Sequence, residues 1–139
     1  MTLITVASET PEGFRHSVQI GEHALHTDLP VAAGGENSAP DPHDYFDAAL
    51  AACKALTLKL YAQRKGIPLS GLNVEVQRDA SQEQKGAYGI KVKLTLHGDL
   101  SDAQREELHR VADRCPVHKL MTTADVSIET KLSEGAFSQ

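Results

Sequence analysis

Hydrophobic and polar residues alternate in three short segments near the start of the chain, and this alternation predicts strands. Residues 3–6 are rich in β-forming types, residues 14–20 alternate with period two, and residues 23–27 follow a turn at Gly21 and Glu22. A two-residue turn of this kind joins antiparallel neighbours. The three segments therefore predict an antiparallel meander.

A long apolar helix is predicted after an aperiodic loop. Residues 28–41 contain prolines and glycines without hydrophobic periodicity, as expected of a loop. Asp41 and Pro42 are typical of a helix N-cap and of the first helical position. Residues 43–65 contain neither Gly nor Pro, which favours an uninterrupted helix, and Gly66 is a typical helix end. At 1.5 Å per residue the helix would be about 35 Å long. Its middle is apolar around most of the circumference, so we expect it to be central.

Two further strands and a second helix follow. Residues 72–77 and 90–96 alternate strictly, which predicts strands that cover a core with one face and meet water with the other. Ser101, with Gln104 at the third helical position, has the capping-box pattern of a helix start. We expect this helix to run to about Arg114.

The last part of the chain completes the predicted fold. Pro116 breaks the second helix and can begin another short turn. Residues 126–132 alternate again, which predicts a last strand, and a polar tail begins at about residue 133. This order of elements indicates an α+β fold with a mainly antiparallel sheet, in a single domain over residues 1–139.

Composition and charge exclude several classes of function. The 139 residues carry 14 basic and 19 acidic side chains, a net charge of −5, and only 4% aromatic residues. Nucleic acid and anionic membrane are therefore poor partners. No stretch approaches the roughly 20 apolar residues of a membrane span, and the N-terminus lacks the pattern of a signal peptide. We expect a cytoplasmic protein whose two cysteines are reduced at rest.

The two cysteines are the main candidates for chemistry. Cys53 lies among small residues of the long helix, where the alternative is a buried core residue without reactivity. Cys115 lies at a helix end between Arg114 and the cations His118 and Lys119, which would lower the pKa of its thiol. The C-terminus of the preceding helix opposes this effect, whereas the N-terminus of a following turn assists it.

The spacing of the cysteines leaves more than one kind of site open. They are too far apart for a Cys-x-x-Cys unit but can meet in space as an attacking and a resolving thiol. A metal site would need Cys53, Cys115, His118 and a further histidine, and the Cys-x-x-His spacing is a weak signal for one. We therefore predict no metal.

Distinctive segments extend over nearly the whole chain. They are Asp28-x-Pro30, Gly34-Gly35-Glu36, Pro42, Ala48-Ala49-Leu50-Ala51-Ala52-Cys53 and Arg114-Cys115-Pro116-Val117-His118. Together they resemble the OsmC/organic hydroperoxide resistance (Ohr) family, and most closely its OsmC-like branch, from about Gly13 to Leu132. The resemblance implies antiparallel sheets around a long central helix, in an intertwined homodimer with its active sites at the subunit interface.

The resemblance also implies roles for individual residues. Cys53 matches the peroxidatic thiol, Cys115 matches the resolving thiol, and Arg15 is the candidate for the arginine that polarises thiolate and peroxide. The family glutamate that holds this arginine stands ten residues before the first cysteine, where this chain has His43. Its neighbours in the predicted pocket are Asp44, Glu36, Leu50 and Leu56.

The resulting hypothesis is a thiol-dependent peroxidase of stress defence. It would reduce organic hydroperoxides, and inorganic peroxide less well, through Cys53 and Cys115, with an external dithiol as reductant and without a cofactor. The alternative is a catalytically weak OsmC-like module that binds a small apolar or thiol ligand at the dimer interface. The replacement of the family glutamate by His43 leaves this alternative open.

Overall fold

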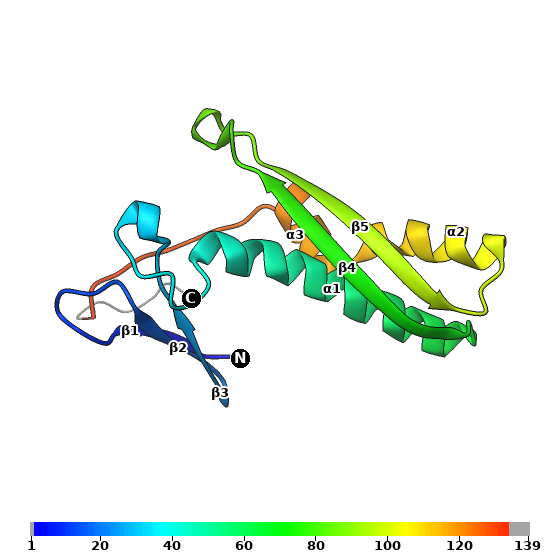
Figure 1. Ribbon diagram of the computed structural model, residues 1–139, viewed down its shortest axis with the longest axis horizontal. Helices are drawn as coiled ribbons and strands as arrows, with labels where there is room; N and C mark the ends of the chain where they lie inside the picture. The colour runs from blue at the N-terminus through cyan, green and yellow to red at the C-terminus, as the bar shows by residue number, and fades with distance from the viewer. Residues whose placement is uncertain (1, 134–139) are drawn as a thin grey trace. The chain divides into compact units, whose positions relative to one another are not determined.

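The three alternating N-terminal segments form the predicted antiparallel meander. In the computed structural model, which describes residues 2–133, strands β1 (Ile4–Ser8), β2 (His16–Ile20) and β3 (His23–Thr27) pair in that order (Figure 1, blue). Ile20 lies opposite His23 across the two-residue turn. Gly21 in that turn has a φ of 56°, which glycine adopts without strain.

A buried carboxylate holds the loop that follows the meander. Asp28 is 3% exposed and accepts hydrogen bonds from the backbone N–H groups of Leu29, Glu36 and Ser38 and from the Ser38 hydroxyl. These bonds, the Ser38 hydroxyl first, lower the pKa of Asp28 to about 2. A Cβ on Gly35 would stand 2.1 Å from the Leu29 carbonyl oxygen, so only glycine fits at that position.

The long helix begins and ends where the sequence predicts. Helix α1 (Pro42–Lys65) has 24 residues. The Asp44 N–H donates to the Asp41 carboxylate at 2.8 Å, and the Asp41 N–H donates to the Asp44 carboxylate at 3.0 Å. This reciprocal pair acts as a capping box, because each carboxylate satisfies an N–H that the helix leaves unpaired. Gly66, with a φ of 68°, follows the last residue.

The second half of the chain contains a strand pair and two shorter helices. Strands β4 (Leu69–Asp79) and β5 (Gly89–Gly98) form a two-stranded sheet and are longer than predicted (Figure 1, green). Helix α2 (Asp102–Val111) has the predicted capping box between Ser101 and Gln104. The remaining elements are the 3-10 turns η1 (Val31–Ala33), η2 (Glu83–Lys85) and η3 (Ala112–Arg114) and helix α3 (Pro116–Thr122).

The predicted last strand is wrong for the described chain. Residues 126–132 form no strand, and the side chains of Val126, Ile128 and Leu132 are 62%, 83% and 82% exposed. Alternation indicates which faces of an extended segment differ, but a strand also needs a neighbour that pairs with its backbone groups. Within residues 2–133, no strand pairs with this segment.

The chain divides into two compact units. The first contains the residues up to Ala49 together with Val76–Lys91, and the second contains Leu50–Glu75 together with the chain from Val92 onward. The prediction of a single domain over residues 1–139 stays a prediction. The predicted polar tail, apart from Ser133, lies outside the described residues.

The main hydrophobic core belongs to the second unit. It joins the C-terminal part of α1, the start of β4 and one face of α2, and its members are Leu58, Ala62, Ile67, Leu69, Leu108, Val111 and Ala112. Leu72, Leu94 and Leu96 pack against it from the inner faces of the strands. Full burial of a leucine such as Leu58 or Leu108 contributes about 1.5–3 kcal/mol. This core fixes the elements that carry both cysteines.

Candidate functional site

Cys115 is a fully buried thiol at the junction of η3 and α3. It is the N-cap of α3, and its sulfur accepts the His118 backbone N–H at 3.4 Å. Burial raises the pKa of the thiol, and a hydrogen bond with the Cys53 thiol raises it further. The His118 N–H and the charge of Lys54 act in the opposite direction but do not outweigh burial. The prediction that neighbouring cations lower the pKa of the Cys115 thiol is therefore wrong for the net shift.

Cys53 lies in the middle of α1 and is only partly buried. Its sulfur is 3.9 Å from the Thr57 hydroxyl, one helical turn further along. The contact with Cys115 joins residues 62 positions apart, and both belong to the second unit. The structure thus brings the two sequence-predicted thiols together, with the more accessible sulfur on the helix.

Lys54 is a member of this cluster that the sequence analysis missed. Its side chain is 2% exposed, and its ammonium donates to the Ala112 carbonyl at 2.8 Å and contacts His118 Nδ1 at 3.0 Å and Asp113 Oδ1 at 3.3 Å. A lysine directly after Cys53 in an Ala/Leu-rich stretch is the sequence signal that could have found it.

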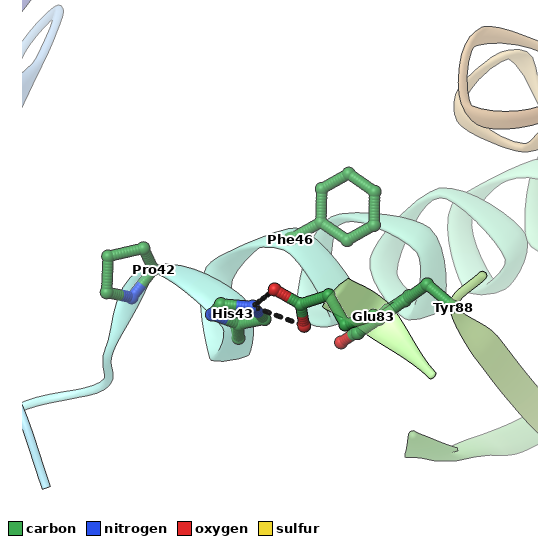
Figure 2. A pocket seen from close by; sticks show the side chains of 5 residues that line it. All are labelled: Pro42, His43, Phe46, Glu83 and Tyr88. Atoms are coloured by element: carbon green, nitrogen blue, oxygen red, sulfur yellow. Dashed lines mark hydrogen bonds and ion pairs between the residues drawn. The ribbon is translucent and has the colours of Figure 1, made fainter. Parts of the chain in front are cut away.

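A pocket of about 360 Å³ lies in the first unit beside His43. It is lined by Pro42, His43, Phe46, Glu83 and Tyr88. Figure 2 shows the His43 ring paired with the Glu83 carboxylate, with Nε2 at 2.9 and 3.0 Å from its two oxygens. The hydrogen bond and charge of Glu83 raise the pKa of His43. His43, at the position where the resemblance places a family glutamate, is therefore paired with a glutamate from η2.

The first turns of α1 bind an arginine that the sequence patterns do not single out. Arg78 of β4 pairs with Asp44 and donates through Nε to Asp47, which is 4% exposed, at 2.5 Å. The Tyr88 hydroxyl donates to the other oxygen of Asp47 at 2.7 Å. Burial, followed by this hydrogen bond, raises the pKa of Tyr88 to about 12. Arg78 and Asp47 escaped the sequence analysis because their pairing joins α1 to a strand 31 residues away.

Arg15 and Glu36 lie in the loop region of the first unit. The Arg15 guanidinium donates to the Ser38 carbonyl at 2.9 Å and pairs with Glu9 at 3.3 Å. Glu36 contributes its backbone N–H to Asp28. Cys53 belongs to the second unit, so the pairing of Arg15 with Cys53 stays a prediction.

The two leucines predicted to form apolar walls differ in exposure. Leu50 is 5% exposed, whereas Leu56 is 71% exposed. Among residues 2–133, no group of three or more His, Cys, Asp or Glu side chains is placed to hold a metal ion. No described helix is both long and apolar enough to cross a membrane.

The described residues form an α+β fold with one long helix, α1. The family model for OsmC-like protein matches residues 35–131, more than half of the sequence. The chain therefore belongs to the OsmC-like family, as the sequence motifs predict. Among curated proteins, none matches at a significant level.

Solved structures support the same fold. The OsmC-like protein of Mycoplasma pneumoniae is 21% identical with a TM-score of 0.71, and covers 88% of each chain. An organic hydroperoxide resistance protein OsmC of Legionella pneumophila, also described as a predicted redox protein, is 25% identical with a TM-score of 0.64, over 88% of this chain and 90% of its own. The organic hydroperoxide resistance protein OhrB of Bacillus subtilis is 23% identical with a TM-score of 0.59, over 88% and 91%.

Proposed function

We propose that this protein is a thiol-dependent peroxidase that reduces organic hydroperoxides, and inorganic peroxide less well, in stress defence. The observation that carries the proposal is the contact between Cys53 and Cys115 in the second unit. Membership of the OsmC-like family and the similarity to organic hydroperoxide resistance proteins support the substrate class. Arg15 is the proposed activating cation.

The surroundings of the two sulfurs favour different roles. Cys53 is partly exposed and can meet a substrate, which suits the attacking thiolate. Cys115 is fully buried and burial raises the pKa of its thiol, which makes it the less accessible and less readily ionised partner and suits a resolving thiol. We therefore assign attack to Cys53 and resolution to Cys115.

The proposed cycle balances with one external reductant. The Cys53 thiolate attacks the distal oxygen of the hydroperoxide, the O–O bond breaks, and the alkoxide takes a proton to leave as an alcohol. The Cys53 sulfenic acid then condenses with the Cys115 thiol to form a disulfide and water. An external dithiol reduces the disulfide by exchange and is itself oxidised. No metal, flavin or nicotinamide enters the cycle, and we place the protein in the cytoplasm as a homodimer.

Peroxide consumption by the purified protein tests the proposal. With dithiothreitol as reductant, cumene hydroperoxide should disappear faster than in the blank without protein. Cys53→Ser should abolish turnover because a serine hydroxyl has no thiolate-like population at neutral pH. Cys115→Ser should consume one equivalent of peroxide in a burst and leave Cys53 as sulfenic acid. Lys59→Met, at an exposed position of the same helix, is the matched control and should retain turnover.

Three results would contradict parts of the proposal. A burst in Cys53→Ser but not in Cys115→Ser would reverse the two roles. Equal bursts in both variants would mean nonspecific oxidation of thiols. Two free thiols persisting after stoichiometric peroxide, measured by mass spectrometry, would favour the alternative of a binding module without efficient catalysis.

A further inference from the structure

Lys54 is a buried cation in the cluster that contains the two thiols. Its side chain is 2% exposed, whereas Lys59, little more than one turn further along α1, is exposed. Transfer of an ammonium group out of water is unfavourable unless other acceptors replace the water. The contacts of Lys54 therefore have to supply these acceptors.

Three acceptors surround the Lys54 nitrogen. They are the Ala112 carbonyl at 2.8 Å, His118 Nδ1 at 3.0 Å and the Asp113 carboxylate at 3.3 Å. An ammonium group has three N–H donors and no acceptor, so this set matches the charged side chain. Because an ammonium group only donates, His118 Nδ1 is the acceptor in its contact with Lys54.

These acceptors flank Cys115 along the chain. Ala112 and Asp113 precede Cys115 and His118 follows it, whereas Lys54 directly follows Cys53 in α1. The three contacts of one side chain therefore tie the segment that carries Cys115 to the helical turn that carries Cys53. The titratable groups in contact with Lys54 or Cys115 are Cys53 of α1, Asp113 of η3 and His118 of α3. Two more, Lys93 of β5 and His109 of α2, line a cavity of about 390 Å³ together with Lys54.

We propose that Lys54 is the positioning residue of the resolving step, in which its ammonium holds Cys115 beside Cys53 and stabilises the negative charge that develops on the Cys115 sulfur. This inference rests on the proposed function. In the step, an S–S bond forms, the S–O bond of the Cys53 sulfenic acid breaks, and the proton of the Cys115 thiol leaves with the hydroxyl as water. The charge of Lys54 lowers the pKa of Cys115 against the effect of burial, in the direction that this role requires.

A titration of Cys115 alone tests the charge. In Cys53→Ser, Cys115 is the only cysteine, so ultraviolet absorption of the thiolate follows its ionisation directly. Adding Lys54→Met should move the midpoint to higher pH, because the substitution removes a nearby positive charge. Lys54→Arg should keep the midpoint closer to that of the parent, and the exposed Lys59→Met should leave it unchanged. If Lys54→Met does not fold, as judged by circular dichroism, Lys54→Gln keeps an amide donor without the charge and serves the same comparison.

The rate of disulfide formation tests the role in the reaction. After one equivalent of cumene hydroperoxide, Lys54→Met should form the Cys53–Cys115 disulfide about tenfold more slowly at neutral pH. A tenfold change corresponds to about one pKa unit, the lower end of the shift that a nearby opposite charge produces. Its pH–rate profile should move to higher pH, which a purely structural loss would not produce. An unmoved titration midpoint together with an unmoved pH–rate profile would overturn the inference while the parent still turns over peroxide. Absence of peroxide consumption by the parent protein would overturn the proposed function instead.

Discussion

Arg15 is partly exposed and its two side-chain contacts lie within the first unit, so its removal should affect chemistry more than stability. Its guanidinium pairs with Glu9 and the Ser38 carbonyl, and its side chain is 37% exposed. We expect Arg15→Ala to change the free energy of unfolding by no more than about 0.5 kcal/mol. If Arg15 serves Cys53, the same substitution should slow alkylation of Cys53 at neutral pH, measured in the Cys115→Ser background so that only one thiol reacts.

A conservative variant and an unrelated arginine make this measurement specific. Arg15→Lys keeps the charge and should retain most of the alkylation rate, and Arg105→Ala, in α2, should have no effect. An alkylation rate that is the same in Arg15→Ala and the parent would remove Arg15 from the site. His43 would then be the next candidate for the activating group.

Asp28 should make the loop between β3 and α1 sensitive to acid. Hydrogen bonds, led by the Ser38 hydroxyl, lower its pKa from 3.8 to about 2. A carboxylate with a lowered pKa contributes stability that is fully present above its unfolded pKa and is lost as pH falls through its folded pKa. Asp28→Asn should therefore destabilise the protein at neutral pH, because the amide NH₂ group would face the N–H and O–H donors that Asp28 accepts from. The difference in stability from the parent should shrink as pH falls from 3.8 to 2.

Denaturant unfolding at several pH values measures this difference. Asp99→Asn, at an exposed position of the loop after β5, serves as the control and should show no such convergence. A stability difference between Asp28→Asn and the parent that stays constant down to pH 2 would mean that the Asp28 carboxylate does not hold the loop.

Local sequence patterns single out some residues of the chain and miss those whose partners are distant in the sequence. Cys53 and Cys115 were recognisable because each lies in a distinctive short segment. Lys54 and Arg78 were missed because exposure is the usual state of both residue types. Their importance comes from contacts with η3 and α1 that no local pattern encodes.

At the level of elements, the capping box of α2 makes a separate prediction. The Ser101 hydroxyl accepts the Gln104 N–H at 3.1 Å, and the Gln104 side chain accepts the Ser101 N–H at 3.0 Å. Ser101→Ala should lower the free energy of unfolding by about 1 kcal/mol. Ser101→Asp keeps an acceptor and adds a favourable charge at the helix N-terminus, so it should show little or no loss. Thermal unfolding of both variants tests this, and equal losses would show that the cap itself does not matter.

Elements with clear start and stop signals were predicted closely. Helix α1 begins at Pro42 and is followed by Gly66 as expected, because cap residues and glycine act through local backbone geometry. The strand predicted over residues 126–132 was wrong, since alternation cannot supply a pairing partner. Leu56 shows the same limit of sequence patterns: its apolar side chain predicts burial but does not identify the surface that would bury it.

At the scale of the whole molecule, the exposed apolar side chains of α1 support the predicted homodimer. In the second unit, Leu56 is 71% and Leu60 47% exposed on a helix whose other face contributes Leu58 and Ala62 to the core. Leu56 and Leu60 are four positions apart, so they lie on one face of the helix. Apolar patches of this kind on small proteins commonly mark an interface, and a second copy of α1 is the partner that the family resemblance implies.

Light scattering at micromolar concentration should therefore give twice the 15.0 kDa mass of one chain. Leu56→Glu should shift the protein toward the single-chain mass, because dimerisation would bury an unpaired carboxylate. Thr95→Glu, at an exposed position of β5, introduces the same charge elsewhere and should remain a dimer. A parent protein that scatters as 15.0 kDa would refute the homodimer, whereas a Leu56→Glu variant that remains dimeric would place the interface on a different surface.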